Sequence, residues 1–420
     1  MSFSIGLSGL RATNQDLGTI SQNIANVSTA GFKAGRSEFA AIYSGGQPGG
    51  VEVAKVSLNF DKDGDQVYTG RALDLAIAGG GFFVTNVNGQ TAYTRAGTFN
   101  KDLDNYIVAT NGGRLQGYPV NATGQLLTGV VQDLRISTAS MPAKASTKLE
   151  VVGNLKSDAS VIDVTAPGYT FDPLNASSYN YSQSGKVYDS LGTEHVLTQY
   201  FIKTGANTWQ VNYTVDGADQ GSATLSFDAA GRLLGGDGTV SGGAEFSHTV
   251  AFTPAGANPL SIDVNYGATV PTDPVAAAKF VSPMSQYAGS FAFTRNQSDG
   301  YASGDLAGVR VEENGNLYAV FSNGQDQLQG QVVMANFANP DGLRQGNSTS
   351  WYQSFASGQP VVGVPGSGTL GKLTAGAYEG SNVELSDELV NLMTAQRNYQ
   401  ANSKSIAAAD KMTQVLFNAV

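Results

Sequence analysis

The sequence has 420 residues, of which 41% are hydrophobic and only 14% are charged, and its formal net charge at pH 7 is −10. This acidic balance argues against a nucleic-acid backbone or an anionic membrane surface as the main partner. Because the chain contains no cysteine, it can form neither a disulfide framework nor a cysteine-ligated metal site.

The N-terminus is predicted to form an amphipathic helix over residues 3–25. Its seam positions recur at alternating steps of four and three residues, which places them on one narrow stripe that can pack against another helix. Gly31 is suited to a left-handed turn that ends the helix. The first basic residue is Arg11, and polar residues interrupt the apolar ones, so the segment does not resemble a cleavable secretory signal. The seam consists of Phe3, Leu7, Leu10, Asn14, Leu17, Ser21 and Ile24.

The next segment, residues 31–70, is predicted to be an extended and poorly regular connector with a glycine-rich break at 45–50, and short strands within it are left open. Within it, residues 61–65 resemble the start of a calcium-binding loop. Gln66 and Ala72, however, stand where that pattern requires glycine and glutamate. An acidic turn is therefore preferred to a calcium site.

From residue 71 the pattern changes to β structure, and strand-like runs separated by short glycine-containing turns predict three hairpins. Residues 145–283 differ in texture, being richer in Ser, Thr, Ala, Gly and Asp. They are predicted to form an outer β domain inserted into an inner β domain made of residues 71–144 and 284–357. The hairpins are predicted at residues 82–95, 196–227 and 317–337.

A second connector, residues 358–379, leads to a C-terminal helical segment, residues 380–420. The helix is predicted to begin near Asn382 or Ser386, with Ser386 as its N-cap because acidic residues follow at once. Residues 1–30 and 380–420 together make the helical domain. Its second seam repeats the first spacing and consists of Leu385, Leu389, Leu392, Gln396, Tyr399, Ser403 and Ile406.

The predicted fold class is mostly β with α-helical termini: antiparallel terminal helices form a coiled-coil domain, and two β-rich domains are nested by insertion. The seams alone leave two arrangements open, a helical hairpin inside an ordinary monomer or a contact between copies. A polar pair within an apolar seam would fix the register, either within one subunit or between neighbours. The expected neighbours are Phe3 with Ile406, Ile24 with Leu385, and Asn14 with Gln396.

Catalytic motifs are weak in this sequence. His195 and His248 are joined by no motif, and no G-x-S-x-G elbow is present. Residues 79–81, three glycines, enter a predicted strand rather than a helix, so a tight turn or close packing is preferred to a phosphate site. Carboxylates are plentiful, which leaves a glycosidase open, but nothing selects a pair. We expect no enzyme activity, no cofactor and no bound metal.

The two ends of the chain resemble the bacterial flagellar rod and hook protein family. Residues 21–33 are similar to the N-terminal signature of that family, and residues 384–402 are similar to its C-terminal signature. Residues 73–83 and 93–99 resemble the first β domain that its members share. The residues that carry the signatures are Asn23, Ala25, Asn26, Gly31, Phe32, Lys33, Gln400 and Asn402.

Length favours the hook members, because rod members lack a large insert such as residues 145–283. The resemblance implies a structural subunit that assembles into a flexible curved tube and transmits motor torque from the rod to the filament. A distal rod subunit and a secreted β-rich adhesin are the alternatives. In the tube the helical seams would be buried, and the glycine-rich stretches 45–50 and 358–371 would serve as hinges.

The resemblance also implies partners and a location. The partners are other copies of the chain, the rod protein at the proximal end, the hook–filament junction protein and hook cap at the distal end, and the flagellar type III export apparatus. Neither nucleic acid nor membrane insertion is expected. The location is extracellular, at the flagellar basal body and hook, and it is reached without cleavage of a signal peptide.

Overall fold

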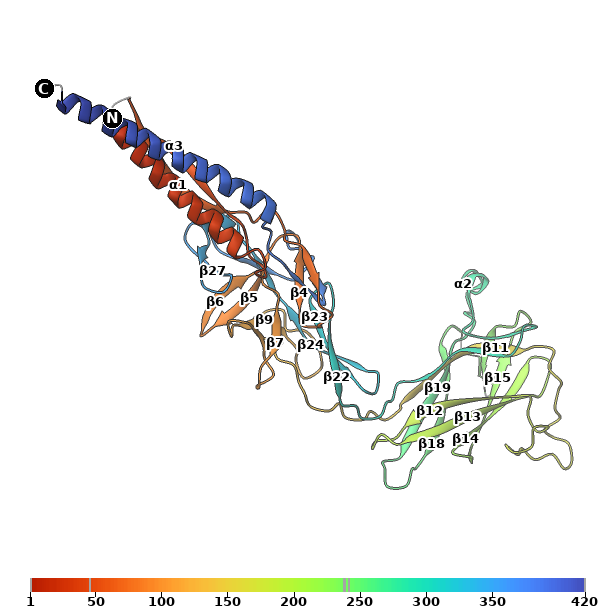
Figure 1. Cartoon of the computed structure of the whole chain (residues 1–420). Coiled ribbons are helices and arrows are strands. Elements are labelled where there is room, and N and C mark those ends of the chain that lie inside the picture. The colour runs from red at the N-terminus through yellow and green to blue at the C-terminus, as the bar shows by residue number, and fades with distance from the viewer. Residues whose placement is uncertain (1, 45–46, 237–238, 241, 419–420) are drawn as a thin grey trace. The chain divides into compact units, whose positions relative to one another are not determined.

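The structure is a computed structural model that describes residues 2–44, 47–236, 239–240 and 242–418. The chain divides into two compact units (Figure 1). Unit 1 comprises Met1–Thr138, Ala307–Val320 and Asp326–Val420, and unit 2 comprises Ala139–Leu306 and Phe321–Gln325. In the part of the chain that is described, no helix is long and apolar enough to cross a membrane.

Unit 1 contains the two terminal helices and the strands that flank them in sequence. Its N-terminal elements are α1 (Ser2–Ala25), β1 (Gly35–Ser44), β2 (Gln47–Leu58), β3 (Gln66–Tyr68), β4 (Leu75–Ala78), β5 (Phe82–Val87), β6 (Gln90–Thr94), β7 (Phe99–Lys101), β8 (Ile107–Ala109), β9 (Arg114–Pro119) and β10 (Gln132–Asp133). Its C-terminal elements are β22 (Leu306–Val311), β23 (Asn316–Phe321), β24 (Asp326–Val332), β25 (Met334–Asn336), η1 (Pro340–Gly342), β26 (Arg344–Gln345), β27 (Ser350–Tyr352), β28 (Val361–Gly363), β29 (Lys372–Ala375), β30 (Ala377–Glu379) and α3 (Leu385–Asn418).

The terminal helices begin close to where the sequence predicts. Helix α1 ends at Ala25, and Gly31 has the expected positive φ of 66°. A Cβ at Gly31 would lie 2.3 Å from the Ala96 backbone nitrogen, so glycine is also required for close packing at this position. Helix α3 begins at Leu385, and the Glu388 N–H donates to the Glu384 carbonyl. Ser386 therefore lies inside the first turn, and its predicted N-cap role is wrong.

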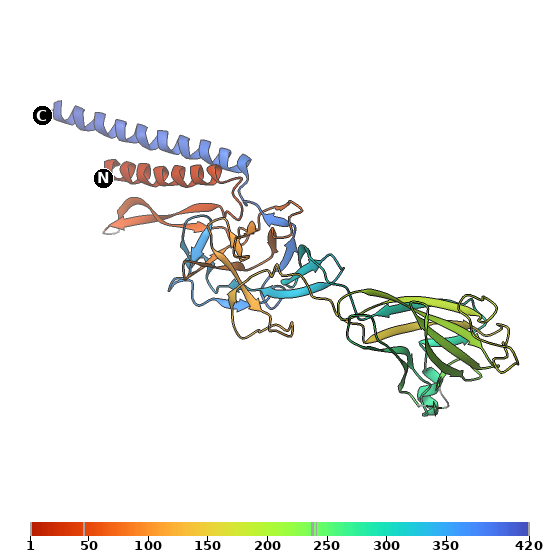
Figure 2. The ribbon, with the colours of Figure 1, turned by 90° about the horizontal axis from the view of Figure 1, so that it is seen from below.

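The predicted connector 31–70 is regular for much of its length. Strands β1 and β2 form an antiparallel hairpin that packs along α1 (Figure 2). The predicted hinge at 45–50 is wrong where it can be judged: residues 47–50 belong to β2, while residues 45–46 lie outside the described residues. The two strands are regular because they pair with each other and pack along the helix beside them.

The second connector also belongs to the β structure of unit 1. Strand β28 pairs with β25, and β29 pairs with β4, so residues 358–379 contain ordered strands rather than a free hinge. The glycine run at 79–81 packs against this segment: a Cβ at Gly81 would lie 3.0 Å from Leu370 Cδ2. The close-packing interpretation of these glycines is thereby confirmed.

The inner strands of unit 1 form one large sheet with the order β22-β23-β24-β9-β5-β6-β27-β26 along its main path. The predicted hairpin at 82–95 is confirmed as β5–β6, and the pairing of β23 with β24 confirms the one at 317–337. Aromatic side chains pack edge to face in its core, with Phe82 and Trp351 ring centroids 5.6 Å apart. Phe60, from the loop after β2, joins them and ties the hairpin to the sheet.

Unit 2 is built from two sheets around one core. Its elements are β11 (Lys148–Lys156), β12 (Tyr181–Tyr188), β13 (Glu194–Lys203), β14 (Thr208–Val215), β15 (Ala218–Phe227), β16 (Leu233–Gly236), β17 (Thr239–Val240), β18 (Glu245–Phe252), β19 (Leu260–Ala268), α2 (Pro274–Lys279), β20 (Met284–Tyr287) and β21 (Ala292–Ser298). One sheet runs β12 to β17 in sequence order, and the other has the order β18-β19-β11-β20, with β21 beside β11. The predicted strands and turns of 196–227 are confirmed as β13–β15.

The outer domain is longer than the sequence indicates. Strand β20 pairs in parallel with β11, and β21 pairs antiparallel with β11, so residues 284–298 belong to unit 2. Their assignment to the inner domain is wrong. A parallel pairing between strands more than a hundred residues apart leaves no local turn signal, and a change of composition could not locate the boundary.

Candidate assembly surface

Helices α1 and α3 lie side by side and antiparallel (Figures 1 and 2). Small residues of α1 allow this approach: a Cβ at Gly6 would lie 2.8 Å from Ile406 Cγ1, and one at Gly9 would lie 2.9 Å from the Asn402 side chain. Near the other end, the Asn23 amide donates to Glu388 Oε1 at 3.2 Å. The contact between the two helices is therefore close, and it contains glycine and polar side chains.

Most positions of the predicted seams lie beside the line along which the two helices meet, although the seam residue Ile406 contacts α1 at Gly6. Apart from Ala12 and Thr19, which lie on the hairpin side, the buried positions of α1 each precede a seam residue by one, and the buried Ala395 of α3 does the same. Because one residue turns an α-helix by about 100°, each seam is rotated away from the partner helix by about a quarter turn. The buried or half-buried positions that carry the contact are Gly6, Gly9, Thr13, Ile20 and Asn23 on α1, and Glu388, Ala395 and Asn402 on α3.

The rotation brings both seams to one side of the helix pair. Both seams follow the contact positions by one residue, and the helices are antiparallel, so the two rotations point to the same side. Hairpin β1–β2 covers α1 through Ala12 and Thr19, on the side of the helix away from this seam. The two seams thus form one surface, which we call the shared apolar face.

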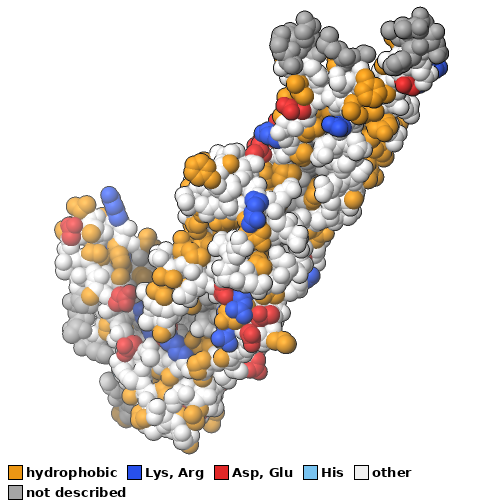
Figure 3. All heavy atoms as spheres, turned by 90° about the vertical axis from the view of Figure 1, so that its left-hand side faces the viewer, with side chains coloured by type: hydrophobic (Ala, Val, Ile, Leu, Met, Phe, Trp, Pro, Cys, Tyr) orange, Lys and Arg blue, Asp and Glu red, His pale blue; other side chains and the backbone are white. Residues whose placement is uncertain are grey.

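Much of the shared apolar face is exposed to solvent. Phe3 is 54% exposed and Leu389 is 46% exposed, which is unusual for large apolar side chains at a regular helical spacing. Figure 3 shows hydrophobic side chains on the surface of this helical part of unit 1. The exposed seam residues are Phe3, Leu7, Asn14, Ser21, Leu385, Leu389, Gln396, Tyr399 and Ser403, and the half-buried ones are Leu10, Leu17, Ile24, Leu392 and Ile406.

The expected register is close to the observed one, although the faces differ. Gly6 and Ile406 are neighbours across the pair, within a few residues of the predicted match of Phe3 with Ile406. Asn14 and Gln396 are both exposed, so one chain alone does not enclose this amide pair. Pairing of these amides between neighbouring copies stays a prediction.

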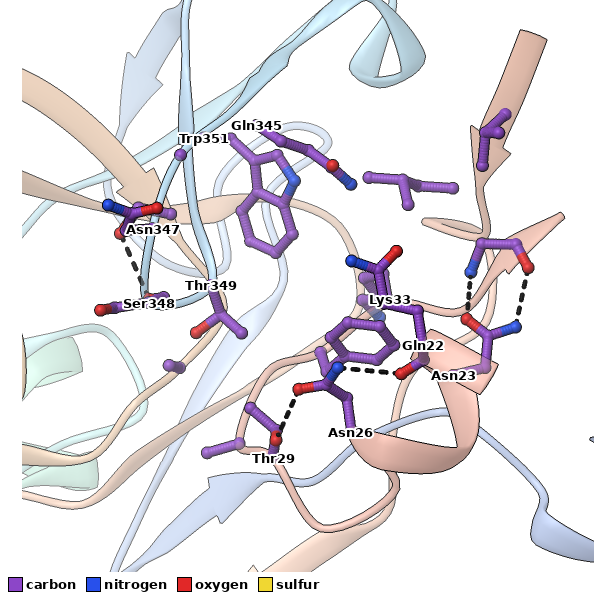
Figure 4. Close-up of a pocket in the computed structure, with 18 of the residues that line it drawn as sticks. Gln22, Asn23, Asn26, Thr29, Lys33, Gln345, Asn347, Ser348, Thr349 and Trp351 are labelled. Carbon is purple, nitrogen blue, oxygen red and sulfur yellow. Dashed lines mark hydrogen bonds between the residues drawn. The ribbon is translucent and has the colours of Figure 1, made fainter. Parts of the chain in front are cut away.

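The signature residues Asn23 and Asn26 form hydrogen bonds that stabilise the end of α1. The Asn23 side chain donates to the Gly35 carbonyl at 2.8 Å and accepts from the Gly35 N–H at 2.9 Å, which fixes the start of β1 against the helix. Asn26 donates to the Gln22 carbonyl and accepts from the Thr29 hydroxyl (Figure 4). These bonds satisfy backbone groups where the helix ends. Ala25 and Gln400 are exposed, and Phe32 is half-buried.

A groove of about 1170 Å³ opens beside this helix end. Figure 4 shows the end of α1 on one side of it and Trp351 with residues 345–349 on the other. Ser348 and Thr349 both have positive φ, at 57° and 49°, and the Thr349 carbonyl accepts from the Thr94 hydroxyl at 2.8 Å. The loop is therefore held in a costly conformation by its hydrogen bonds.

Lys33 lies at the centre of a buried charged cluster that joins the helical end of unit 1 to its strands. Its ammonium is 2.8 Å from Glu379 Oε1, and a guanidinium nitrogen of Arg95 is 3.3 Å from Glu379 Oε2. Arg95 also pairs with Asp63 at 2.9 Å. Burial lowers the pKa of Lys33, and neighbouring Arg95 acts in the same direction while Glu379 opposes it. Removing one member would leave an uncompensated buried charge.

Two carboxylates, Asp16 on α1 and Glu388 on α3, line the same groove. Burial raises the pKa of Asp16, against a hydrogen bond from Ser37 that lowers it. Burial also raises the pKa of Glu388, and the charges of Asp16 and Asp387 add to that rise. Both carboxyl groups are therefore held in a place that disfavours their charged forms.

The other sequence candidates have structural partners. Asp63, in the predicted acidic turn, pairs with Arg95 and accepts from the Gly79 N–H at 3.0 Å, which makes it part of the turn's own structure. His195 Nδ1 lies 2.7 Å from Asp216, and His248 stacks on Tyr213 with centroids 4.9 Å apart. Within the described ranges, no group of three or more His, Cys, Asp or Glu side chains is placed to hold a metal ion.

Some residues of this surface carried no usable sequence signal. Glu379 and Arg95 lie far apart in the chain and in no common motif, so their meeting with Lys33 follows only from the fold. Gly6 and Gly9 had a signal: both are small, and both precede seam positions by one residue. A search for small residues next to an apolar stripe would have identified the helix contact.

Three family models match the chain. They are described as flagella basal body rod protein over residues 3–33, flagellar basal body protein FlaE D2 domain over residues 154–301, and flagellar basal body rod FlgEFG protein C-terminal over residues 374–419. The matches at the two ends cover most of the residues that form the helix pair.

Curated relatives match over the whole length. The chain is 37% identical to the flagellar hook protein FlgE of Escherichia coli and 38% identical to that of Salmonella typhimurium, with 100% of each chain covered in both comparisons. It is 32% identical to the Rhizobium meliloti protein of the same name, over 98% of this chain and 97% of the relative. Among solved structures, flagellar hook protein FlgE2 of Helicobacter pylori aligns with a TM-score of 0.49 at 14% identity, covering 73% of this chain and 98% of that one.

Proposed function

The chain belongs to the bacterial flagellar hook protein family, and from this premise we propose that the shared apolar face is its assembly surface. In this proposal copies of the chain form a curved, flexible tube that joins the rod to the filament and transmits torque. The helix pairs of neighbouring copies meet through the shared apolar face.

The observation that carries the proposal is the exposure of regularly spaced apolar side chains on both helices. Fully burying one large apolar side chain contributes roughly 1.5–3 kcal/mol. Five that are about half exposed would then contribute roughly 3–7 kcal/mol before the costs of association. They are Phe3, Leu7, Leu385, Leu389 and Tyr399.

The proposed contact is heterologous. The shared apolar face consists of one stripe from each helix, and the stripes differ in sequence, so a neighbour can join by setting its α3 stripe on the α1 stripe of the next copy. Heterologous contacts that do not close into a ring produce open helical assemblies, as a tube requires. Asn14 and Gln396 would be the polar pair that fixes the register of this contact.

Partners and route follow from the family and belong to the proposal. The first copies would meet the rod protein, the last would meet the hook–filament junction protein and the hook cap, and export would use the flagellar type III apparatus. The interrupted apolar pattern near Arg11 supports export without cleavage of a signal peptide.

The double variant Leu389→Asp/Leu392→Asp tests the assembly surface. It should abolish polymerisation of the purified protein, because two carboxylates would have to be buried at the contact. Electron microscopy and sedimentation would detect tubes, and circular dichroism would check that the β units remain folded.

A matched control carries the same two charges on the outward side of α1. Gln15→Asp/Gln22→Asp changes two exposed residues that lie off the shared apolar face. This control should polymerise like the parent chain. Tubes of normal length from Leu389→Asp/Leu392→Asp, or equal loss in the control, would contradict the proposed surface.

A further inference from the structure

Helix α3 carries a second stripe that faces away from both α1 and the shared apolar face. Arg397, Lys404 and Lys411 are spaced by seven residues, so they lie on one side of the helix. All three are exposed, and none forms an ion pair with another described residue. The stripe is nearly opposite Ala395 and Asn402 on the helical wheel, so it points outward from the helix pair.

The same unit carries an acidic groove of about 630 Å³ where α1, α3 and hairpin β1–β2 meet. Asp16 and Glu388 lie within it, and Glu388 Oε2 is buried without a hydrogen-bond partner in the structure. At the rim, Glu38 and Asp341 are 3.6 Å and 3.9 Å from the Lys55 ammonium. The acidic members are Asp16, Glu38, Asp61, Asp341 and Glu388, and the groove's own cation is Arg36.

Building on the proposed function, we propose that the outer stripe of α3 docks on the acidic groove of a second copy. The argument is charge complementarity: an unpartnered basic helix face and an under-neutralised acidic groove occur on the same unit of an acidic chain. Because the stripe points outward, it cannot reach the groove of its own chain, and the contact must join two copies. It is separate from the shared apolar face, so each copy would contact its neighbours through two surfaces of different chemistry.

The second surface would have a distinct role. An apolar contact is non-directional, whereas charged pairs select partners and register and penalise wrong placements. The spacing of seven residues along α3 would allow successive cations to meet the groove at a defined height. The stripe would therefore help to decide which neighbour is contacted and at which register.

Charge reversal tests the docking. Arg397→Glu/Lys404→Glu should raise the concentration needed for polymerisation about tenfold, as the loss of one or two partly exposed ion pairs requires. Asp61→Lys/Asp341→Lys, on the groove rim, should have a similar effect. The four changes combined in one chain should restore polymerisation towards the parent value, because the charges would again be complementary.

The control keeps the charge change and moves it away from the helices. Lys101→Glu/Lys279→Glu alters two exposed lysines on β7 and α2 by the same total charge and should leave the critical concentration unchanged. The defect of Arg397→Glu/Lys404→Glu should also shrink at high salt, where exposed charges are screened. Failure of the combined variant to recover, or an equal defect in the control, would overturn the docking.

These outcomes are distinguishable from failure of the proposed function. If Leu389→Asp/Leu392→Asp abolishes tubes while the charge reversals leave the critical concentration unchanged, the assembly surface stands and the stripe does not dock. If the charge variants behave as expected but the leucine variant forms normal tubes, the stripe docks and the shared apolar face is not the main contact.

Discussion

Unit 2 and the helix pair of unit 1 differ in how far their large side chains are buried. In unit 2, Trp209, Tyr213 and Tyr266 are fully buried, and their polar atoms are satisfied inside the core: Trp209 donates to Gln286 at 2.6 Å, and the two tyrosine hydroxyls lie 2.7 Å apart. In the helix pair, Ile20 is buried together with small residues, but many of the large apolar side chains, such as Phe3 and Leu389, are about half exposed. Unit 2 buries its large side chains within one copy, whereas the helix pair exposes the shared apolar face that we propose a neighbouring copy covers.

This difference suggests separate roles, with stability supplied by the core of unit 2 and assembly, in our proposal, supplied by the helix pair. Burial of large apolar groups supplies most of the free energy of folding, so unit 2 can hold its shape in one copy. An isolated helix is marginal in water, and here α1 and α3 contact through glycines and asparagines. Much of their apolar surface is exposed in one copy, as the proposed assembly surface requires.

The largest expected effect is the difference in lost stability between two side-chain truncations, one in unit 2 and one in the helix pair. Trp209→Ala should destabilise unit 2 by about 3–5 kcal/mol, because it opens a cavity in a dry core. Leu389→Ala should change the stability of the unassembled chain by no more than about 0.5 kcal/mol, because the side chain is already half exposed. Urea unfolding followed by circular dichroism below the polymerisation threshold measures both. A loss above about 2 kcal/mol in the free energy of unfolding of Leu389→Ala would contradict the proposed difference between unit 2 and the helix pair.

The sequence could predict what local pattern determines. Both terminal helices, the hairpin β5–β6 and the strands β13–β15 follow from periodicity and turn residues, and the structure contains them. It could also identify the stripe of large apolar residues on each helix. The apolar stripe by itself did not locate the contact between the helices, because Gly6 and Gly9, which allow the close approach, lie one residue beside it.

Contacts between distant segments could not be predicted from the sequence either, because no local pattern encodes them. The pairing of Lys33 with Glu379 joins residues 346 positions apart, and the pairing of β20 with β11 crosses most of unit 2. Each depends on how several elements pack together. Strand β2 has a local signal in the apolar and polar residues that alternate in much of 51–58, but its pairing with β1 and its packing on α1 depend on the fold.

A smaller effect tests the helix contact itself. Gly9→Leu should weaken the pairing of α1 with α3 by about 1–3 kcal/mol, since its side chain would meet Asn402 at under 3.0 Å. Gly18→Leu is the matched control: a Cβ at Gly18 meets nothing within 4 Å, and the change should favour the helix by up to about 1 kcal/mol. Thermal unfolding at 222 nm reports the helices. Equal behaviour of the two variants would show that the close approach does not hold the pair.

The smallest expected effect is a difference in how the two regions respond to pH, because the pKa values of their carboxylates are shifted in opposite directions. Burial tends to raise the pKa of Asp299 in unit 2, but hydrogen bonds from the Lys148 and Thr147 N–H groups and from Lys144 outweigh burial and hold that pKa well below its usual range. Its contribution is therefore present above the unfolded pKa of about 3.9 and is lost as pH falls towards the lower folded value. For Asp16 and Glu388 the folded pKa is raised, so their contribution is present below the unfolded value and is lost as pH rises through the folded one.

Acidification from pH 6 to pH 3 should thus weaken unit 2 and favour the helix pair. The sequence contains two tryptophans, and in a Trp351→Phe background the fluorescence of Trp209 reports unit 2 alone, while ellipticity at 222 nm reports mainly α1 and α3. Asp299→Asn should flatten the acid loss in unit 2, at a cost of about 1–2 kcal/mol at neutral pH because the amide accepts fewer of these bonds. Asp16→Asn/Glu388→Gln should remove the acid gain in the helices, since neither amide titrates. A parallel loss of stability in both regions as pH falls would contradict this prediction. It would show that burial does not raise the pKa values of Asp16 and Glu388 enough to favour the helix pair in acid.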